Sequence, residues 1–253
     1  MRAIERRHEI VQDTLAHGKV EVDQLVARYD VSAVTIRADL NYLAKKNLLV
    51  RTRGGAVASH RIQRELTIDE KHNAQTEVKR RLAAAAKSLI NEGDALILDS
   101  GSTTAEIAKT LGDLEHLVVM TNGLNVAQNL LQHDGIEVLM TGGILRKTSQ
   151  SFYGRQAEDS IERYHFNKVI LGVDGIDFNS GLTTHFEYEA ILNRLMCNVA
   201  GTVIAVTDSS KFNRAGVHKI CGLEDLDVLV TDEGVPEMFV KEVEKLGVKV
   251  IIA

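Results

Sequence analysis

The chain has 253 residues, 44% of them hydrophobic, so it is long enough for one large or two modest folded domains and is not a disordered protein. Its net charge is −5 at pH 7, but residues 1–64 hold 12 Lys and Arg against 7 Asp and Glu, and the remainder is acidic. A basic first part before an acidic body is the distribution expected if only the first part meets a phosphate backbone.

Further features of the composition exclude other classes of protein. Cys197 and Cys221 are too few for a disulfide framework and lack CxxC spacing, so we expect free thiols. The N-terminus has no apolar segment of a signal peptide, and no run of about eighteen apolar residues occurs, so a soluble cytoplasmic protein is expected. The nine histidines are dispersed, so we expect no metal site and no cofactor.

The first helix is predicted over residues 3–16, where apolar residues recur among charges and Gly18 follows as a stop signal. Its Arg6 and Arg7 either contact phosphate or are solvated, and the sequence does not decide between these. A second, shorter amphipathic helix follows at residues 22–29, and Asp30 and Val31 make the tight connection that a helix-turn-helix requires.

The third helix is the element that points to function. Ser32 precedes it as an N-cap, and the spacing of Val34, Ile36, Leu40 and Leu43 predicts that these four side chains face a core. Short polar and cationic groups on the other face fit the major groove of DNA, where they can meet phosphates and base edges. Counting the cap, the groups predicted to meet DNA from this helix are Ser32, Thr35, Arg37, Ala38, Asn41 and Lys45.

A cationic hairpin follows this helix. Residues 48–50 read as a strand, Arg51 and Arg53 flank a turn, and two glycines supply its backbone freedom. Arginines on such a wing hold phosphates or enter the minor groove. The alternative, a helical hairpin with a solvated charged face, explains the two helices but not the wing, so we predict a winged helix-turn-helix over residues 1–57.

Residues 56–67 lack periodicity and are predicted to connect two domains, followed by one long helix over 69–90. Residues 58–92 are therefore assigned as linker and connecting helix, and 93–253 as a second domain. There, short apolar, β-branched runs alternate with helical stretches, which predicts a mostly parallel sheet covered on both faces. The predicted strands are 95–99, 117–121, 136–141, 168–173, 202–207, 227–231 and 248–253, and the predicted helices are 103–111, 124–133, 186–200 and 236–246.

Polar loops follow five of the predicted strands. Ligands of open α/β sheets bind beyond the carboxyl ends of the strands, so these loops predict a polar cleft. The first loop places Ser102, Thr103 and Thr104 at a helix start, where free amides and the helix dipole favour an anion; a plain N-cap is the alternative. We predict a phosphate site. The residues predicted to bind the effector are Asp99, Gly101, Ser102, Thr103, Thr104, Asn122, Gly142, Gly143, Asp174, Glu187 and Lys211.

The N-terminal pattern resembles the DeoR family of bacterial regulators of sugar metabolism. The matching residues are Arg7, Ile10, Leu25, Val31, Ser32, Thr35, Ile36, Arg37, Asp39, Leu40, Leu43, Leu48, Arg51, Gly54 and Gly55. Ala38 stands where the family usually has a polar or cationic residue, and Asn47 where it often has glycine. Within the family the chain looks most like the repressors of amino-sugar operons, of the N-acetylgalactosamine type, on segments 149–154, 184–190 and 207–214.

This resemblance covers essentially the whole chain and implies a C-terminal sensor domain similar to ribose-5-phosphate isomerase. It implies an effector that is a phosphorylated sugar, such as galactosamine 6-phosphate or its N-acetyl form, and release from operator DNA when the effector binds. A homo-oligomer is expected, because one helix-turn-helix presents little surface and specific binding commonly uses two heads. The rival hypothesis is a sugar-phosphate isomerase or deaminase, for which Asp174, Asp177, His185 and Glu187 offer acid and base groups.

Overall fold

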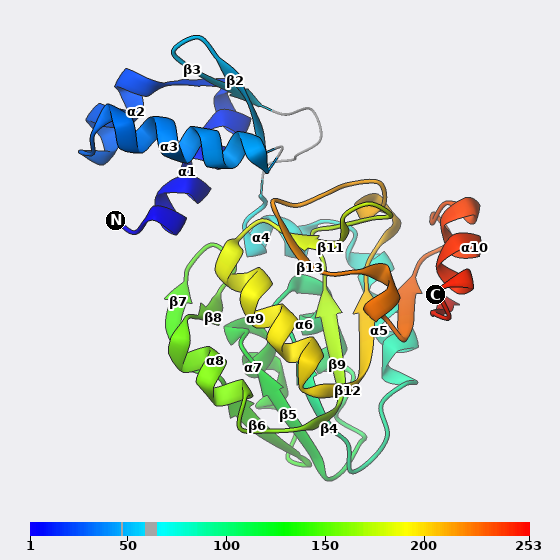
Figure 1. The fold of residues 1–253 in the computed structure, drawn as a ribbon. Helices are drawn as coiled ribbons and strands as arrows, with labels where there is room; N and C mark the ends of the chain where they lie inside the picture. Colours follow the sequence, from blue (N-terminus) through cyan, green and yellow to red (C-terminus); the bar gives the residue numbers. More distant parts are fainter. Residues whose placement is uncertain (47, 59–64) are drawn as a thin grey trace.

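The computed structural model describes residues 1–46, 48–58 and 65–253, and shows a small N-terminal unit, the head, above a larger α/β unit (Figure 1). Asn47 and residues 59–64, half of the predicted connection over 56–67, lie outside the described residues. The head, residues 1–58, contains three helices and a three-stranded sheet of order β1-β3-β2. Its elements are α1 Ala3–His17, β1 Lys19–Glu21, α2 Val22–Tyr29, α3 Ala33–Lys45, β2 Leu49–Thr52 and β3 Gly55–Ala58.

A single apolar core holds the head together. Ile10 of α1, Leu25 of α2, and Ile36 and Leu40 of α3 are almost fully buried in it. The short first strand, β1, was not predicted, and it pairs antiparallel with β3 so that the wing is anchored to the chain that enters α2. The predicted winged helix-turn-helix is therefore present, with one strand more than expected.

The prediction of a single helix over 69–90 is wrong. The structure has two helices there, α4 Ile68–Asn73 and α5 Thr76–Lys87, separated at Gln75, whose φ of 54° is left-handed. Thr67 caps α4 by accepting from the amide of Glu70 at 3.3 Å. The ammonium of Lys79 donates to the carbonyl oxygen of Ala74 at 2.6 Å and to that of Lys71, so a side chain from α5 satisfies backbone oxygens at the break.

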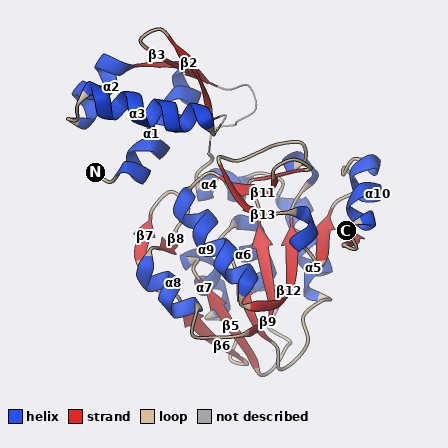
Figure 2. Ribbon diagram, in the orientation of Figure 1, coloured by secondary structure: helices blue, strands red, loops and turns tan. Residues whose placement is uncertain are grey.

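All seven predicted long strands form one parallel sheet of order β15-β14-β12-β9-β4-β5-β6. Figure 2 draws strands of this sheet in red among the blue helices of the larger unit. The chain runs outward from β4 through β5 to β6, and then returns to β9 on the other side of β4, so β4 and β9 meet at the topological switch point. The strands are β4 Ala95–Leu98, β5 Leu117–Thr121, β6 Ile136–Met140, β9 Phe166–Gly172, β12 Ala200–Val206, β14 Val228–Thr231 and β15 Lys249–Ile252.

Helices cover both faces of this sheet, as the continuous apolar strands require. Within β4, Ile97 faces one core, and Leu96 and Leu98 face the other. The first core is shared with α8 Arg155–Ile161, α9 Glu187–Asn198 and α10 Glu237–Lys245, and the second with α5, α6 Ser102–Lys109 and α7 Leu124–Leu130. Helix α8 was not predicted.

Short antiparallel strands that were not predicted lie outside the main sheet. One pair, β7 Ile144–Arg146 and β8 Ser151–Tyr153, packs beside α8 and α9. The other three, β10 Gly175–Asp177, β11 Gly181–Thr184 and β13 His218–Cys221, form a small sheet on the side of the sheet facing the head (Figure 1). These strands carry the chain over the carboxyl ends of β9 and β12.

Candidate functional site

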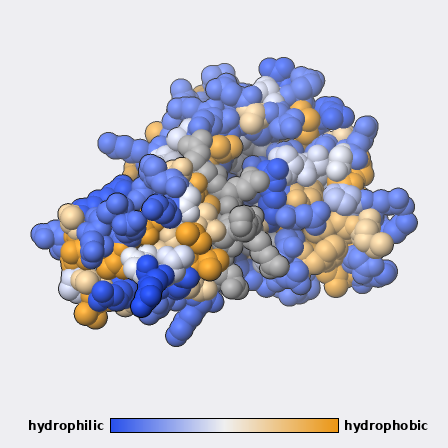
Figure 3. Space-filling model, turned by 90° about the horizontal axis from the view of Figure 1, so that it is seen from above, coloured by the Kyte–Doolittle hydropathy of each residue, from blue (hydrophilic) through white to orange (hydrophobic). Residues whose placement is uncertain are grey.

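The outer face of α3 is polar and accessible. The Ser32 hydroxyl accepts the amide of Thr35 at 3.1 Å, which confirms the predicted N-cap. Arg37, Asn41 and Lys45 are exposed on one side of the helix together with Ala38, and Thr35 is half-buried. Seen from above, hydrophilic side chains cover most of the head, with apolar ones between them (Figure 3). The predicted DNA-facing residues of α3 therefore share a surface.

Val34 does not face the core as predicted. Its side chain is 74% exposed, whereas Ile36, Leu40 and Leu43 are buried. Two residues along a helix turn the direction by about 200°, so Val34 and Ile36 point to opposite sides. Val34 thus adds an apolar group to the outer face of α3, where thymine methyl groups offer apolar contacts.

The wing is a tight hairpin with its two arginines in different situations. Arg51 is half-buried, and its Nη1 donates to the carbonyl oxygen of Gly55 at 2.6 Å, so it braces the turn. Arg53 is exposed at the tip, beside Gly54, whose φ of 94° sets the turn. Arg53 is the wing residue that is better placed to meet a DNA backbone.

Arg6 and Arg7 have a structural partner that the sequence analysis did not consider. The Nε atoms of both donate to the carboxylate of Asp39 on α3, each at 2.7 Å, and Asp39 is only 1% exposed. The Arg7 guanidinium also lies 4.0 Å above the ring of Tyr42. These contacts fix α1 to the inner side of α3.

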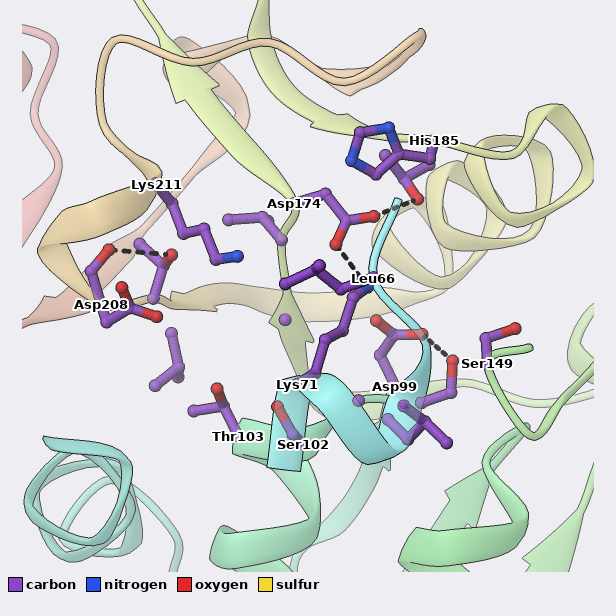
Figure 4. A pocket seen from close by; sticks show the side chains of 18 of the residues that line it. Leu66, Lys71, Asp99, Ser102, Thr103, Ser149, Asp174, His185, Asp208 and Lys211 are labelled. Carbon is purple, nitrogen blue, oxygen red and sulfur yellow. Dashed lines mark hydrogen bonds and ion pairs between the residues drawn. The ribbon is translucent and has the colours of Figure 1, made fainter. Parts of the chain in front are cut away.

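A polar cavity lies at the topological switch point, beyond the carboxyl ends of β4, β9 and β12. Its volume of about 250 Å³ is near the lower end of the roughly 300–1,000 Å³ typical of ligand pockets, which suits a small metabolite. Leu66, Ile68 and Lys71, from the segment that joins the two units, close one side of it (Figure 4). We call this cavity the pocket.

One side of the pocket presents groups that suit an anion. The N-cap residue of α6 is Gly101, which has no side chain. The first backbone amides of this helix therefore have no hydrogen bond from a capping side chain. The hydroxyl groups of Ser102 and Thr103 line the pocket at the same place. Free amides, hydroxyl groups and the positive end of a helix dipole are together a recurrent way to bind phosphate.

Lysines from two other segments reach the same space. Lys211 lies in the short 3-10 helix η1 Ser209–Lys211 after β12, and its side chain extends into the pocket (Figure 4). Lys79 of α5 is 5% exposed and also lines the pocket; burial lowers its pKa to about 8. Lys79 therefore loses its charge just above neutral pH unless an anion lies near it.

The opposite side of the pocket carries carboxylates. Asp174, after β9, accepts from the Lys71 ammonium at 2.6 Å; burial opposes ionisation, but the charge of Lys71 outweighs it and lowers the pKa of Asp174. Asp99, after β4, is 4% exposed, and burial together with repulsion from Glu189 raises its pKa well above the usual value. A neutral Asp99 carries a proton and can donate a hydrogen bond to a hydroxyl oxygen.

Two buried polar atoms in the pocket lining have no hydrogen-bond partner among the described residues. They are Oδ1 of Asn193 and Nδ1 of His185, whose residues are 4% and 6% exposed. Asn193 uses its Nδ2 to donate to Asp99 at 3.3 Å, which leaves its oxygen as an acceptor. Buried polar groups are rarely left unpaired, so both atoms are suited to hydroxyl groups of a polyhydroxy ligand.

Five of the eleven predicted effector residues do not line the pocket. Asn122 is fully buried, and its Oδ1 accepts from the amide of Ser100 at 2.9 Å, so it braces the loop after β4. The Thr104 hydroxyl donates to the carbonyl oxygen of Gly101. Gly142 and Gly143 form a turn with positive φ after β6, two strands away from the switch point.

The fifth is Glu187, the first residue of α9, which does not line the pocket, whereas Glu189 does. The two differ by about 200° around the helix, so only one of them can face inward. Sequence analysis also missed Lys71, Lys79 and Asn193. If the helix break at residue 75 had been recognised, the sequence would have indicated that the two lysines lie near the pocket. The turn between α4 and α5 brings both of them to the edge of the sheet.

The described part of the chain contains no group of three or more His, Cys, Asp and Glu side chains arranged to hold a metal ion. None of its helices is both long and apolar enough to cross a membrane.

A winged helix-turn-helix joined to an α/β unit with a polar pocket is the architecture of a ligand-responsive DNA-binding regulator. Residues 6–61 match the model of the DeoR-like helix-turn-helix domain, and residues 74–233 match that of the DeoR C terminal sensor domain. The chain belongs to the DeoR family of transcriptional regulators. Membership of this family identifies a regulator and not the isomerase or deaminase of the rival hypothesis.

Curated relatives extend over nearly the whole chain. The protein named "Putative aga operon transcriptional repressor" of Escherichia coli O157:H7 is 48% identical over 98% of this chain and 93% of its own length. The glycerol-3-phosphate regulon repressor of E. coli K12 is 31% identical over 93% of each chain. A solved D-ribose-5-phosphate isomerase in complex with phospho-erythronic acid has a TM-score of 0.39 and 21% identity over 54% of each chain, a similarity too low to carry an argument.

Proposed function

We propose that this regulator represses an operon for sugar or amino-sugar catabolism and that a phosphorylated sugar, bound in the pocket, releases it from the operator. The observation that carries the proposal is the pocket itself. The uncapped start of α6 and the lysines 79 and 211 form an anion side, and Asp99, Asn193 and His185 form a side for hydroxyl groups. The names of two relatives, which refer to an aga operon and a glycerol-3-phosphate regulon, support the same class of target.

The DNA side of the proposal rests on the exposed face of α3 and the wing tip. Arg37, Asn41 and Lys45 meet the major groove, and Arg53 meets the backbone beside it. Two heads on paired half-sites supply specific affinity that one head lacks, so the regulator acts as a homo-oligomer. It works in the cytoplasm, where the operator is, and needs no cofactor other than its effector.

Release requires only that the ligand prefer one arrangement of head and sensor. Linkage makes the effect of ligand on DNA affinity equal to the effect of DNA on ligand affinity. A hundredfold loss of operator affinity corresponds to about 2.7 kcal/mol of coupling. Hydrogen bonds to charged groups contribute roughly 1.5–3 kcal/mol each, so one or two contacts made in only one arrangement are sufficient.

Calorimetric titration of the full-length protein tests the ligand half. We expect binding of one or more hexose 6-phosphates or hexosamine 6-phosphates, and no comparable binding of the unphosphorylated sugars. Lys211→Gln should weaken binding by about 10- to 100-fold, because a charge-assisted contact to phosphate is lost. Lys219→Gln is the matched control, since Lys219 is exposed on β13 and does not line the pocket.

Equal affinity for the phosphorylated and unphosphorylated sugars would contradict the anion site. Equal losses in the two lysine variants would contradict the placement of the phosphate near Lys211. Release from the operator is measured separately, with the same ligands, in a DNA-binding titration.

A further inference from the structure

Arg146, at the end of β7, lies where the pocket, the joining segment and the head come together. Its side chain is only 9% exposed, and it contacts residues from three elements that are far apart in the sequence. These partners are Glu65 in the segment between the two units, Glu189 in α9 and His8 in α1. Arg146 does not itself line the pocket.

The strongest of these contacts holds the joining segment. Nη1 and Nη2 of Arg146 donate to the two carboxylate oxygens of Glu65 at 2.6 and 2.7 Å, which is a bidentate pair. Glu65 is 6% exposed, and burial opposes its ionisation. Hydrogen bonds from Arg146 and His8 outweigh the burial and lower the pKa of Glu65 to about 2, so this partner is a fixed anion.

A second contact reaches the head. Nη2 of Arg146 lies 3.0 Å from Nε2 of His8, and Nδ1 of His8 lies 3.3 Å from the backbone oxygen of His185. Nε2 of His8 also lies 3.2 Å from Oε2 of Glu65, so it donates to that carboxylate when it carries a proton and accepts from Arg146 when it does not. The His8 ring also packs edge-on against Phe186, and the Arg146 guanidinium lies 4.4 Å from the centre of the same ring.

The third contact reaches the pocket. Nη1 of Arg146 lies 3.3 Å from Oε1 of Glu189, and Glu189 is a pocket-lining residue. The hydroxyl of Ser149 donates to the same Glu189 oxygen at 2.7 Å. The Thr184 hydroxyl lies 3.3 Å from the other oxygen and 3.1 Å from Asp174, so Thr184 links Glu189 to the pocket's carboxylate side.

Inside the head, the chain of contacts continues to the DNA-facing helix. His8 lies on α1 directly after Arg6 and Arg7, which hold Asp39 on α3. A change in how α1 sits on the sensor therefore moves α3 with it as one body. The steps from the pocket through Arg146 to His8, and from the arginines to Asp39, are contacts between buried or half-buried side chains, and His8 is joined to Arg7 by the backbone of α1.

We infer that Arg146 is the positioning residue that couples ligand occupancy of the pocket to the placement of the head. A ligand that forms hydrogen bonds with Thr184 or Glu189 competes for the carboxylate that Arg146 holds. Arg146 then redistributes its donors between Glu189, Glu65 and His8, and the docking of α1 changes. This inference rests on the proposed function, because it requires that a ligand in the pocket alters DNA affinity.

The planar fork of arginine is essential to this role, because it contacts Glu65, Glu189, His8 and Ser149 in fixed directions at once. A lysine keeps the charge but cannot reproduce the bidentate pair with Glu65. The informative substitution is therefore Arg146→Lys. His8→Ala is the second variant, because it removes the contacts that α1 makes with Arg146 and Glu65 and leaves the bidentate pair of Arg146 and Glu65 in place.

The experiment measures operator affinity of the full-length protein with and without the hexose or hexosamine 6-phosphate that acts most strongly on the unmodified chain. The ratio of the two affinities is the coupling factor. We expect Arg146→Lys and His8→Ala to reduce this factor by about 3- to 30-fold, the range for residues along a coupling network. Calorimetry should show that both variants still bind the ligand.

Two matched controls use the same substitutions at positions without interdomain contacts. Arg155→Lys alters an exposed arginine that pairs within α8, with Glu158 and Asp159. His17→Ala alters an exposed histidine at the end of α1 that pairs with Asp13. Both should leave the coupling factor within about twofold of its original value, since surface ion pairs contribute little.

An unchanged coupling factor in His8→Ala and Arg146→Lys, with DNA and ligand binding retained, would overturn the inference. Equal reductions in the controls would overturn it too. If Arg146→Lys fails to fold, His8→Ala alone decides. If no sugar phosphate alters the operator affinity of the unmodified protein, both the proposed function and the inference are wrong. An unchanged coupling factor in the variants is a different result, because it contradicts the inference and leaves the proposed function in place.

Discussion

Asp39 joins α3 to two arginines of α1, and Asp39→Asn tests how far the integrity of the head depends on these contacts. The substitution preserves shape but removes the charge that holds two arginines of α1. In the structure the carboxylate is 1% exposed, and both Nε contacts are 2.7 Å long. Arg6, itself 7% exposed, would be left as a buried cation without its partner.

The cost can be worked out from these contacts. Breaking a buried ion pair by removing one partner destabilises by about 3–5 kcal/mol, because the remaining charge stays desolvated. A folded unit of 58 residues has a free energy of unfolding of roughly 3–9 kcal/mol at the usual 0.05–0.15 kcal/mol per residue. We therefore expect Asp39→Asn to remove much or all of the stability of the head and to leave the sensor folded.

Hydrogen exchange read by mass spectrometry separates the two units in the full-length chain. Amides of α3 should exchange about 10²- to 10³-fold faster or more, since each 1.36 kcal/mol is a factor of ten. Amides of β9 should be unchanged. Asp13→Asn is the matched control, because Asp13 pairs at the surface with His17 and Arg28 and should lose less than about 1 kcal/mol. Similar protection of α3 in the two variants would refute the reasoning.

Three further predictions concern DNA binding, pH and the wing. Arg37→Ala should lower the slope of log affinity against log salt by about 0.9 if Arg37 meets a phosphate, whereas Lys241→Ala on the far helix α10 should not change it. Lys79, with its pKa lowered to about 8, is protonated below that pH and neutral above it. Affinity for a sugar phosphate should therefore be full at pH 7 and fall about tenfold by pH 9. Calorimetry at several pH values should show that Lys79→Met abolishes this dependence. Gly55→Ala would place a Cβ 2.0 Å from the backbone oxygen of Val20, so the pairing of β1 with β3 should weaken by about 1–3 kcal/mol or more, measurable by exchange of the wing amides.

The long strands could be predicted from sequence because each is a continuous apolar, β-branched run that only a sheet covered on both faces can bury. The short strands could not. Runs of three or four residues such as β1 and β7 have too little periodicity, and they are defined by partners far away in the chain. The break at Gln75 could not be predicted for a similar reason. The carbonyl oxygens of Lys71 and Ala74, before the break, accept hydrogen bonds from the Lys79 ammonium, which belongs to the next helix.

The position of the pocket could be predicted from the sequence, but only some of its lining residues could. The rule that ligands bind beyond the carboxyl ends of parallel strands pointed correctly to the loops after β4, β9 and β12. It also pointed to the loops after β5 and β6, because strand order is not visible in the sequence. Once β9 is seen to pair with β4, Gly143 lies two strands away from the switch point, and Asn122 supports the loop after β4 from beneath and does not line the pocket. Contacts such as that of Arg146 with His8 depend on how two units pack, and no local pattern indicates them.

The central claim is that the head and the pocket of one molecule are thermodynamically linked. The most direct test is a titration of the full-length protein onto labelled DNA from its own upstream region, at about 0.15 M salt, where unspecific phosphate attraction is weakened. The titration is repeated with a panel of hexose and hexosamine 6-phosphates. We predict specific binding that one member of the panel weakens by tenfold or more. Binding no tighter than to random DNA, or specific binding that no sugar phosphate changes, would contradict the account.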